Sequence, residues 1–212
     1  MKKTKYLGLS LMFIALSSCQ IKVGDIESNS EITSIEGTWS TDCMANSSDS
    51  YIKTFTVENG AMTMATFTYK DTRTCLQDNL DSTVIQNGLF INSEDGSTIF
   101  SGRTYEWHLN LVTLTPHNAQ ITTALNTANV CGSNSWVLNQ PGSIFSCSTG
   151  VEFDLSQINE NTVHYGVYTI EGSATPNYLQ FGTDCALSGY QGVCPSASDR
   201  PTSLDGTVYF KR

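Results

Sequence analysis

The chain has 212 residues, of which 39% are hydrophobic and 15% are charged. Its 20 acidic residues outnumber its 11 lysines and arginines, which gives a net charge of −9 at neutral pH. Nucleic acids and anionic lipid surfaces are bound by clusters of basic residues, so this balance argues against both as partners.

The first 18 residues have the three regions of a secretion signal. Three lysines within the first five residues precede an apolar core at Tyr6–Leu16, and small serines follow. A transmembrane helix needs about 20 apolar residues, so this core is too short to be one. Its end, Leu16-Ser17-Ser18-Cys19, resembles the bacterial lipobox, in which the cysteine receives a diacylglycerol and the chain is cut before it. We therefore expect residues 1–18 to be a lipoprotein signal peptide and Cys19 to be lipidated; the alternative is an ordinary signal peptide.

Residues 19–36 are predicted to be the lipidated cysteine and a flexible tether. This segment is mostly polar and has no aromatic residue, and a flexible chain of this length spans about 20–25 Å. Cleavage would leave 8 basic and 20 acidic residues, a net charge of −12. Gln20 after the cysteine resembles the enterobacterial signal for sorting to the outer membrane, which is the expected location. Residues 37–212 then form a single domain.

Alternation of apolar and polar residues predicts strands through most of this domain. Residues 51–58 and 61–70 flank Asn59-Gly60, which is a strong β-hairpin signal. Further strands are expected at 82–92, 98–115, 135–139, 151–157, 162–169 and 206–212. Strict alternation in the second of these would place Tyr105, Trp107, Leu109 and Leu111 on one face.

One segment, residues 116–130, has apolar residues at helical spacing. Asn118 is a suitable N-cap and Gly132 a suitable stop. Threonines lower the intrinsic helicity of this segment, so we expect a short helix that forms only when it packs over one end of the fold.

Eight or nine sequential antiparallel strands with short turns predict an all-β, up-and-down barrel with one short capping helix. Closure of a barrel removes the exposed strand edges that invite aggregation. A two-sheet β-sandwich has the same alternation and is the alternative fold.

Six cysteines remain after Cys19, namely Cys43, Cys75, Cys131, Cys147, Cys185 and Cys194. In an oxidising compartment an even set of cysteines indicates disulfides, and six allow fifteen pairings. A meander keeps neighbouring segments adjacent, which favours the pairs 43–75, 131–147 and 185–194. A metal site is the alternative, but the chain has no Cys-x-x-Cys or His-x-x-x-His spacing, so neither metal nor cofactor is expected.

Gly37-Thr38-Trp39 opens the first expected strand as Gly-x-Trp does in lipocalins, where the tryptophan closes one barrel end beneath a basic side chain from a late strand. That resemblance makes Lys211 or Arg212 the expected partner of Trp39, with Arg212 preferred. Residues 37–212 also resemble a family of uncharacterised small bacterial lipoproteins with a lipocalin-like barrel. The resemblance lies in the Gly-x-Trp motif, Cys43 and the segments "YKDTRTC", "VTLTPHNA" and "CGSNSWVLN". More distantly, the domain resembles that of the adenomatosis-polyposis-coli-down-regulated Wnt antagonists, which accommodates a lipid chain.

Catalysis requires several chemical groups that converge, and the sequence offers no such set. The three histidines, His108, His117 and His164, each have a structural explanation in a strand or at the helix entry. The acidic pairs Glu94/Asp95 and Asp199/Asp205 fall in expected loops, and no nucleophile elbow or phosphate-binding glycine loop is present. The chain is therefore not expected to be an enzyme.

Two functions remain for an outer-membrane-anchored binding module. An eight-stranded barrel can hold one small ligand, and the expected lining of a lipid pocket is Phe55, Met62, Met64, Phe67, Trp107, Leu109 and Leu111. Alternatively the barrel is a solid scaffold, and the loop at 181–201, which displays Tyr190, binds a protein at the cell envelope.

Overall fold

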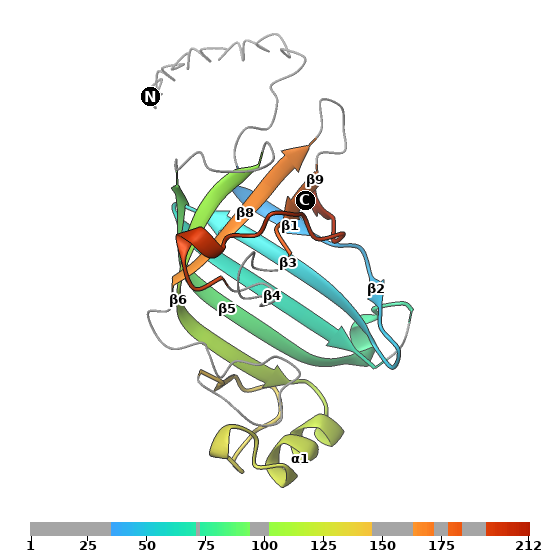
Figure 1. The fold of residues 1–212 in the computed structure, drawn as a ribbon. Coiled ribbons are helices and arrows are strands. Elements are labelled where there is room, and N and C mark those ends of the chain that lie inside the picture. The colour runs from blue at the N-terminus through green and yellow to red at the C-terminus, as the bar shows by residue number, and fades with distance from the viewer. Residues whose placement is uncertain (1–34, 71–72, 94–101, 146–162, 172–177, 184–193) are drawn as a thin grey trace, which may run out of the picture. The chain divides into compact units, whose positions relative to one another are not determined.

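Eight antiparallel strands close into a barrel, and two short strands extend it (Figure 1). The computed structural model describes residues 35–70, 73–93, 102–145, 163–171, 178–183 and 194–212. The described strands are β1 (Gly37–Ser40), β2 (Met44–Ala45), β3 (Ser50–Glu58), β4 (Ala61–Tyr69), β5 (Leu80–Ser93), β6 (Arg103–Pro116), β7 (Gly142–Ser143), β8 (Val163–Glu171), β9 (Tyr178–Phe181) and β10 (Tyr209–Lys211).

The pairing of β1 with β3 closes the ring. Around the barrel the strands follow the order β1-β10-β9-β8-β6-β5-β4-β3, while β2 pairs with β3 and β7 pairs with β6. A two-sheet sandwich would leave separate sheet edges, so the continuous ring of hydrogen bonds decides for the barrel. The described residues lie in a compact unit that spans Glu31–Arg212.

The hairpin between β3 and β4 is confirmed. Asn59 and Gly60 have φ angles of 52° and 77°, and positive φ at both central residues is what the tight turn of a two-residue hairpin requires. The strands pair in unbroken register from Ser50 with Tyr69 to Glu58 with Ala61. Because opposite residues in this register face the same side of the sheet, the hairpin determines which side chains enter the barrel.

A bulge in β6 changes the expected face of one residue. Asn87 pairs with Leu111, whereas the next residue, Gly88, pairs with Leu109, so Asn110 is an extra residue on β6. One extra residue reverses the alternation beyond it. Leu111 therefore points outward and is exposed, which makes its predicted inward position wrong.

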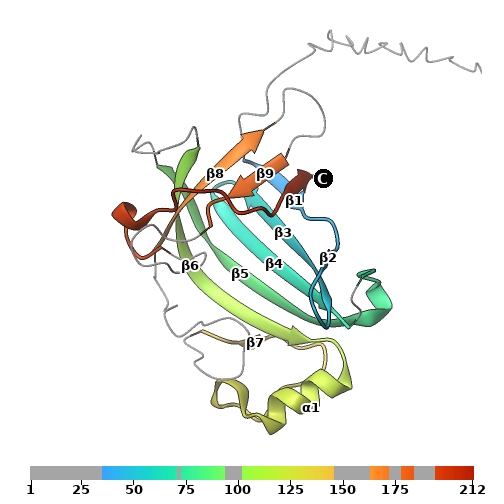
Figure 2. The same cartoon turned by 45° about the vertical axis from the view of Figure 1, so that its right-hand side comes forward.

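The predicted helix is confirmed as α1 (Ala119–Thr127), which lies beyond the end of the barrel where β6 ends (Figures 1 and 2). The side chain of Asn118 accepts a hydrogen bond from the Ile121 amide at 2.8 Å, as an N-cap does. Gly132 is not the stop that we predicted. The helix ends at Thr127, and Asn129 takes the left-handed conformation just after the C-cap.

The strand predicted at 135–139 is wrong, because the side chain of Asn126 replaces a neighbouring strand. Its amide accepts a hydrogen bond from the Trp136 backbone N–H at 2.7 Å and donates one to the Trp136 carbonyl at 3.0 Å. The Trp136 indole packs on Gly142, where an added Cβ would lie 2.6 Å from the ring. The segment is thus held by α1 and β7 without forming a strand.

The remaining expected strands have mixed outcomes. The strand predicted at 162–169 is β8, and β10 lies within 206–212. The strand predicted at 151–157 lies outside the described residues. Strands β2, β7 and β9 have no counterpart among the predicted strands, because they are only two to four residues long. Within the described ranges, no helix has both the length and the apolar character to span a bilayer.

Candidate functional site

The barrel interior has two halves that differ in burial. One, here called the aromatic half, contains buried inward rings from seven strands: Trp39, Phe55, Phe90, Tyr105, Tyr168, Phe181 and Tyr209. The other, here called the polar half, is nearer to α1. Most of its inward residues on β3, β4 and β5 are only partly buried, with the exception of the buried Val84: Tyr51, Lys53, Met64, Thr66, Thr68, Ser82 and Gln86.

Trp39 closes the end of the aromatic half. It is fully buried, and its indole N–H donates a hydrogen bond to the Ile35 carbonyl at 2.8 Å. The Lys211 ammonium lies 5.2 Å from the centroid of the Trp39 ring, within the range of a cation–π interaction. Gly37 makes room for this lysine, because a Cβ there would lie 3.2 Å from the Lys211 side chain.

Lys211, and not the preferred Arg212, is therefore the basic partner of Trp39. Lys211 pairs directly with Trp39 in the β1–β10 register and so shares its inward face. Arg212 follows it by one position. Its guanidinium lies 3.6 Å from the Asp42 carboxylate at the exposed surface. The difference follows from the alternation of a strand, which sends neighbouring residues to opposite faces.

Edge-to-face and stacked ring contacts fill the aromatic half. The Phe55 ring centroid lies 4.8 Å from that of Phe181, and the Phe90 centroid lies 5.2 Å from that of Tyr105. Phe181 also contacts Tyr209 at 5.5 Å. Such pairs stabilise a core beyond their area of burial. Burial also raises the pKa of the Tyr105 phenol, so this ring stays uncharged.

In the polar half most inward side chains of β3, β4 and β5 stay partly exposed, although the inward residues of β6 are buried. Met64 lies opposite Phe55 and Gln86 in the strand registers, yet it remains partly exposed, as Gln86 does. The Lys53 ammonium lies 5.6 Å from the centroid of the Tyr51 ring. Adaptable, polarisable and amphipathic side chains thus line this half.

Trp107 and His164 lie at the boundary between the two halves. They are opposite each other on β6 and β8, with ring centroids 5.5 Å apart. Both are buried, and burial lowers the pKa of His164 to about 4. Among the described residues, the Trp107 indole nitrogen and both His164 ring nitrogens have no hydrogen-bond partner.

The seven residues predicted to line a pocket divide into three groups. Phe55, Met62, Trp107 and Leu109 face inward and are buried, and Met64 faces inward and is partly exposed. Phe67 pairs with Ile52 and Thr83, so it belongs to the outward face of β4. Leu111 is also outward because of the bulge. Residues that the prediction missed include His164, whose strand comes beside β6 only in the folded barrel.

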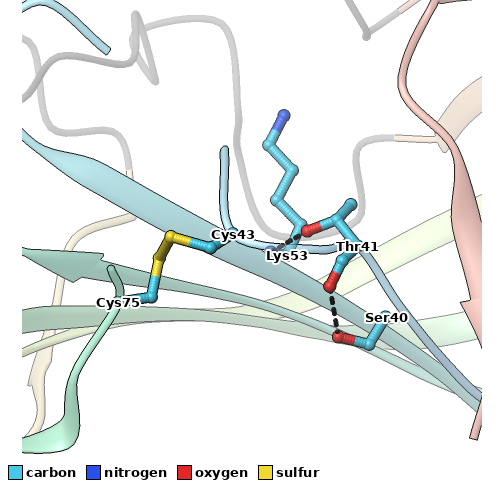
Figure 3. Close-up of a disulfide and its surroundings, with 5 residues drawn as sticks. All are labelled: Ser40, Thr41, Cys43, Lys53 and Cys75. Carbon is cyan, nitrogen blue, oxygen red and sulfur yellow. Dashed lines mark hydrogen bonds between the residues drawn. A yellow bond between two sulfur atoms is a disulfide. The ribbon is translucent and has the colours of Figure 1, made fainter. Parts of the chain in front are cut away.

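One predicted disulfide is described completely. Cys43 and Cys75 are bonded, with their Cα atoms 5.8 Å apart (Figure 3). Two residues before Cys43, Thr41 is bonded to β3 on both sides of Lys53: its amide donates to the Lys53 carbonyl at 2.9 Å, and the Lys53 amide donates to its hydroxyl at 3.0 Å. The disulfide therefore ties the β1–β2 connection to the β4–β5 connection. Closing a loop of 32 residues stabilises the fold by about 3–4 kcal/mol in the chain-entropy account.

Two other cysteines, Cys131 and Cys194, are disulfide-bonded as well. Cys147 and Cys185, their predicted partners, lie outside the described residues, so these two pairings stay predictions. Among the described residues, no group of three or more His, Cys, Asp or Glu side chains is arranged to hold a metal ion.

The other two histidines occupy positions on the outer surface. His117 links the β5 and 135–139 segments, with Thr83 Oγ1 2.9 Å from Nε2 and Asn139 Oδ1 3.0 Å from Nδ1. His108 lies on the outward face of β6, with Nε2 3.5 Å from a Glu106 carboxylate oxygen. Of the acidic pairs, Asp199 is buried beside Arg200, Asp205 is partly buried, and Glu94 and Asp95 are outside the described residues.

The loop proposed as a protein-binding surface is described only at its ends. Phe181 belongs to β9 and is part of the core. The backbones of Cys194 and Tyr165 pair in an isolated antiparallel β-bridge. The Arg200 guanidinium lies 5.2 Å from the Tyr165 ring centroid. Residues 194–201 therefore pack along the outside of β8. Residues 184–193, which include Tyr190, lie outside the described ranges, so partner binding by this loop stays a prediction.

No protein-family model matches the chain, and a search of curated proteins finds no similar sequence.

Proposed function

We propose that this protein is a non-enzymatic binding module, anchored to the outer membrane through lipidated Cys19, that holds a lipid or another small apolar molecule in the polar half of its barrel. One observation carries the proposal. Inward residues of three long strands, including Met64, Thr66 and Gln86, remain partly exposed although they point into a closed barrel. Side chains that fill an interior would be buried, as they are in the aromatic half.

The composition of the polar half suits such a ligand. One wall is apolar, since Leu109, Val112 and Leu114 are buried inward residues of β6. Opposite them are the flexible thioether of Met64 and a few polar groups, a mixture typical of small-molecule sites. The aromatic half is tightly packed and provides a floor.

The anchor is proposed on the N-terminal sequence alone. The positive segment, the short apolar core and Leu16-Ser17-Ser18-Cys19 occur in the order of a lipoprotein signal. Two or three acyl chains hold a protein stably at a membrane.

Native mass spectrometry of the purified protein, combined with uptake of an uncharged, polarity-sensitive naphthalene dye, tests the binding function. We expect a co-purified adduct or saturable dye fluorescence. Thr66→Trp adds a large ring on the inward face of β4 and should abolish both signals by occupying the site.

Thr56→Trp is the matched control, because Thr56 lies on the outward face of the neighbouring strand and bonds Thr38 Oγ1 at the surface. It should leave binding unchanged. A bare mass without dye uptake, or equal binding by the two tryptophan variants, would contradict a ligand inside the barrel.

A further inference from the structure

Two neighbouring rings inside the barrel, Trp107 and His164, carry three polar atoms without partners. The Trp107 indole N–H and the two ring nitrogens of His164 are buried, and no described group is hydrogen-bonded to them. An unsatisfied buried donor or acceptor costs about 1–3 kcal/mol, so native proteins rarely retain several together. A bound group that completes these hydrogen bonds would remove this cost.

The position of the indole is built into the strands. A Cβ on Gly88 would lie 2.4 Å from Trp107 Nε1, so only glycine at this point of β5 admits the ring. The adjacent bulge at Asn110 keeps both Leu109 and Val112 on the inward face. Trp107 is thereby held between β5 and His164, with its indole nitrogen next to Gly88.

The hydrogen-bonding capacity of the pair defines the missing group. An indole nitrogen only donates, whereas a neutral imidazole has one donor and one acceptor. We propose that Trp107 and His164 bind the uncharged hydroxyl head of a long-chain ligand. The hydroxyl oxygen accepts from the indole N–H, and the hydroxyl proton is donated to an imidazole nitrogen. This inference rests on the proposed function and specifies the ligand of the same site.

A charged head group fits this place poorly. With its pKa near 4, His164 is neutral at pH 7 and offers no counter-charge. A buried carboxylate without a counter-charge is unfavourable. The inward cations Lys53 and Lys211 lie instead over the rings of Tyr51 and Trp39.

The tail of the ligand would extend away from the aromatic half. Phe90 and Tyr105 lie on the aromatic side of Trp107 and are packed together. On its other side, towards α1, the inward face of β6 continues with Leu109, Val112 and Leu114. The head therefore lies deep in the barrel, and the alkyl chain lies along β6 in the polar half.

Three probes of similar length separate the possibilities in calorimetric or dye-displacement titrations of the full chain at pH 7: 1-decanol, undecane, in which a methyl group replaces the hydroxyl, and decanoate. Decanol should bind about tenfold more tightly than undecane, which is the expected worth of a satisfied buried hydrogen bond, and more tightly than decanoate. Trp107→Phe and His164→Phe should each remove most of the preference for decanol and leave undecane affinity within about threefold.

Trp136→Phe is the matched control, since its indole bonds the Val130 carbonyl outside the barrel interior. It should keep the preference. In the unmodified protein, decanol and not undecane should move the indole N–H resonance of Trp107, a readout that needs no core variant to fold.

The outcomes are distinct. Binding of decanol and undecane with equal affinity, an unchanged preference in Trp107→Phe, or tighter binding of decanoate overturns the hydroxyl site while the binding function stands. Failure of all three probes to bind counts against the proposed function itself. An unmoved Trp107 resonance at saturating decanol means that water alone occupies the polar atoms, and this also overturns the inference.

Discussion

The two halves of the barrel interior are built from the same alternating strands but differ in how their inward side chains are packed. In the aromatic half, the strands β1, β8, β9 and β10 complete the ring, and large rings from all sides interlock. In the polar half, the inward faces of β3–β5 are partly exposed, and the Cys43–Cys75 bridge ties the surrounding connections together. Packing of the rings stabilises the aromatic half, whereas the polar half is where we propose that a ligand binds.

This difference separates stability from function within one strand. Phe55 and Lys53 are two residues apart on β3 and share its inward face, yet Phe55 is fully buried and Lys53 is not. A change in the aromatic half should therefore alter the free energy of unfolding, while a change in the polar half should mainly alter ligand binding.

The sharpest test compares Phe55→Ala with Met64→Ala, which truncate side chains at paired positions. Phe55→Ala should lower the free energy of unfolding by about 3–5 kcal/mol, because it removes a ring that contacts Phe90 and Phe181. Met64→Ala should cost about 1 kcal/mol or less. Urea denaturation of the oxidised proteins measures both, and equal losses would show that the halves are not distinct.

The boundary between the halves should make stability depend on pH. His164 has a pKa of about 4 in the folded protein, below its value of 6.5 when exposed, so the unfolded chain binds the proton more readily. The stabilisation is complete above pH 6.5 and declines as the pH falls to about 4, a loss of about 3 kcal/mol.

In His164→Phe this part of the pH dependence should disappear. Trp136→Phe provides the comparison, because it changes a buried ring without removing a titratable group, and it should retain the wild-type slope. Urea titrations at intervals from pH 4 to 7 give the slope, and a slope that survives in His164→Phe would assign the effect to other groups.

The smallest effect is expected at the closed end. Lys211→Met keeps the aliphatic stem beside Gly37 and removes the ammonium over Trp39, which should cost about 0.5–1 kcal/mol. Arg212→Met should cost less, because its ion pair with Asp42 is exposed. Thermal unfolding at low and high salt compares the two, and a larger loss for Arg212→Met would reverse the assignment of Lys211 as the closing residue.

Much of the candidate site followed from local pattern. Phe55, Met62, Trp107 and Leu109 were predicted inward and are inward, because regular alternation holds along β3, along β4 and in the first part of β6. Phe67 was wrongly grouped with Met62 and Met64, since an odd spacing places it on the opposite face of the same strand.

Two features lay beyond such reasoning. The Trp107–His164 pair joins strands that are distant along the chain and become neighbours only because β8 pairs with β6. The segment at 135–139 alternates like a strand, but the amide of Asn126 satisfies the Trp136 backbone before any strand can. Neither contact leaves a periodic signal in the sequence.

Short-range chemistry thus determined the elements that depend on neighbouring residues: the Asn59-Gly60 turn, the Asn118 cap of α1, and the alternation that favours a barrel. The tertiary structure decided the lining of the interior. A bulge at Asn110 reverses the faces of β6 beyond it. The Trp107 ring of β6 fits only because the neighbouring strand β5 has a glycine, Gly88, beneath it. Such choices minimise the packing energy of the whole ring of strands, so no single segment encodes them.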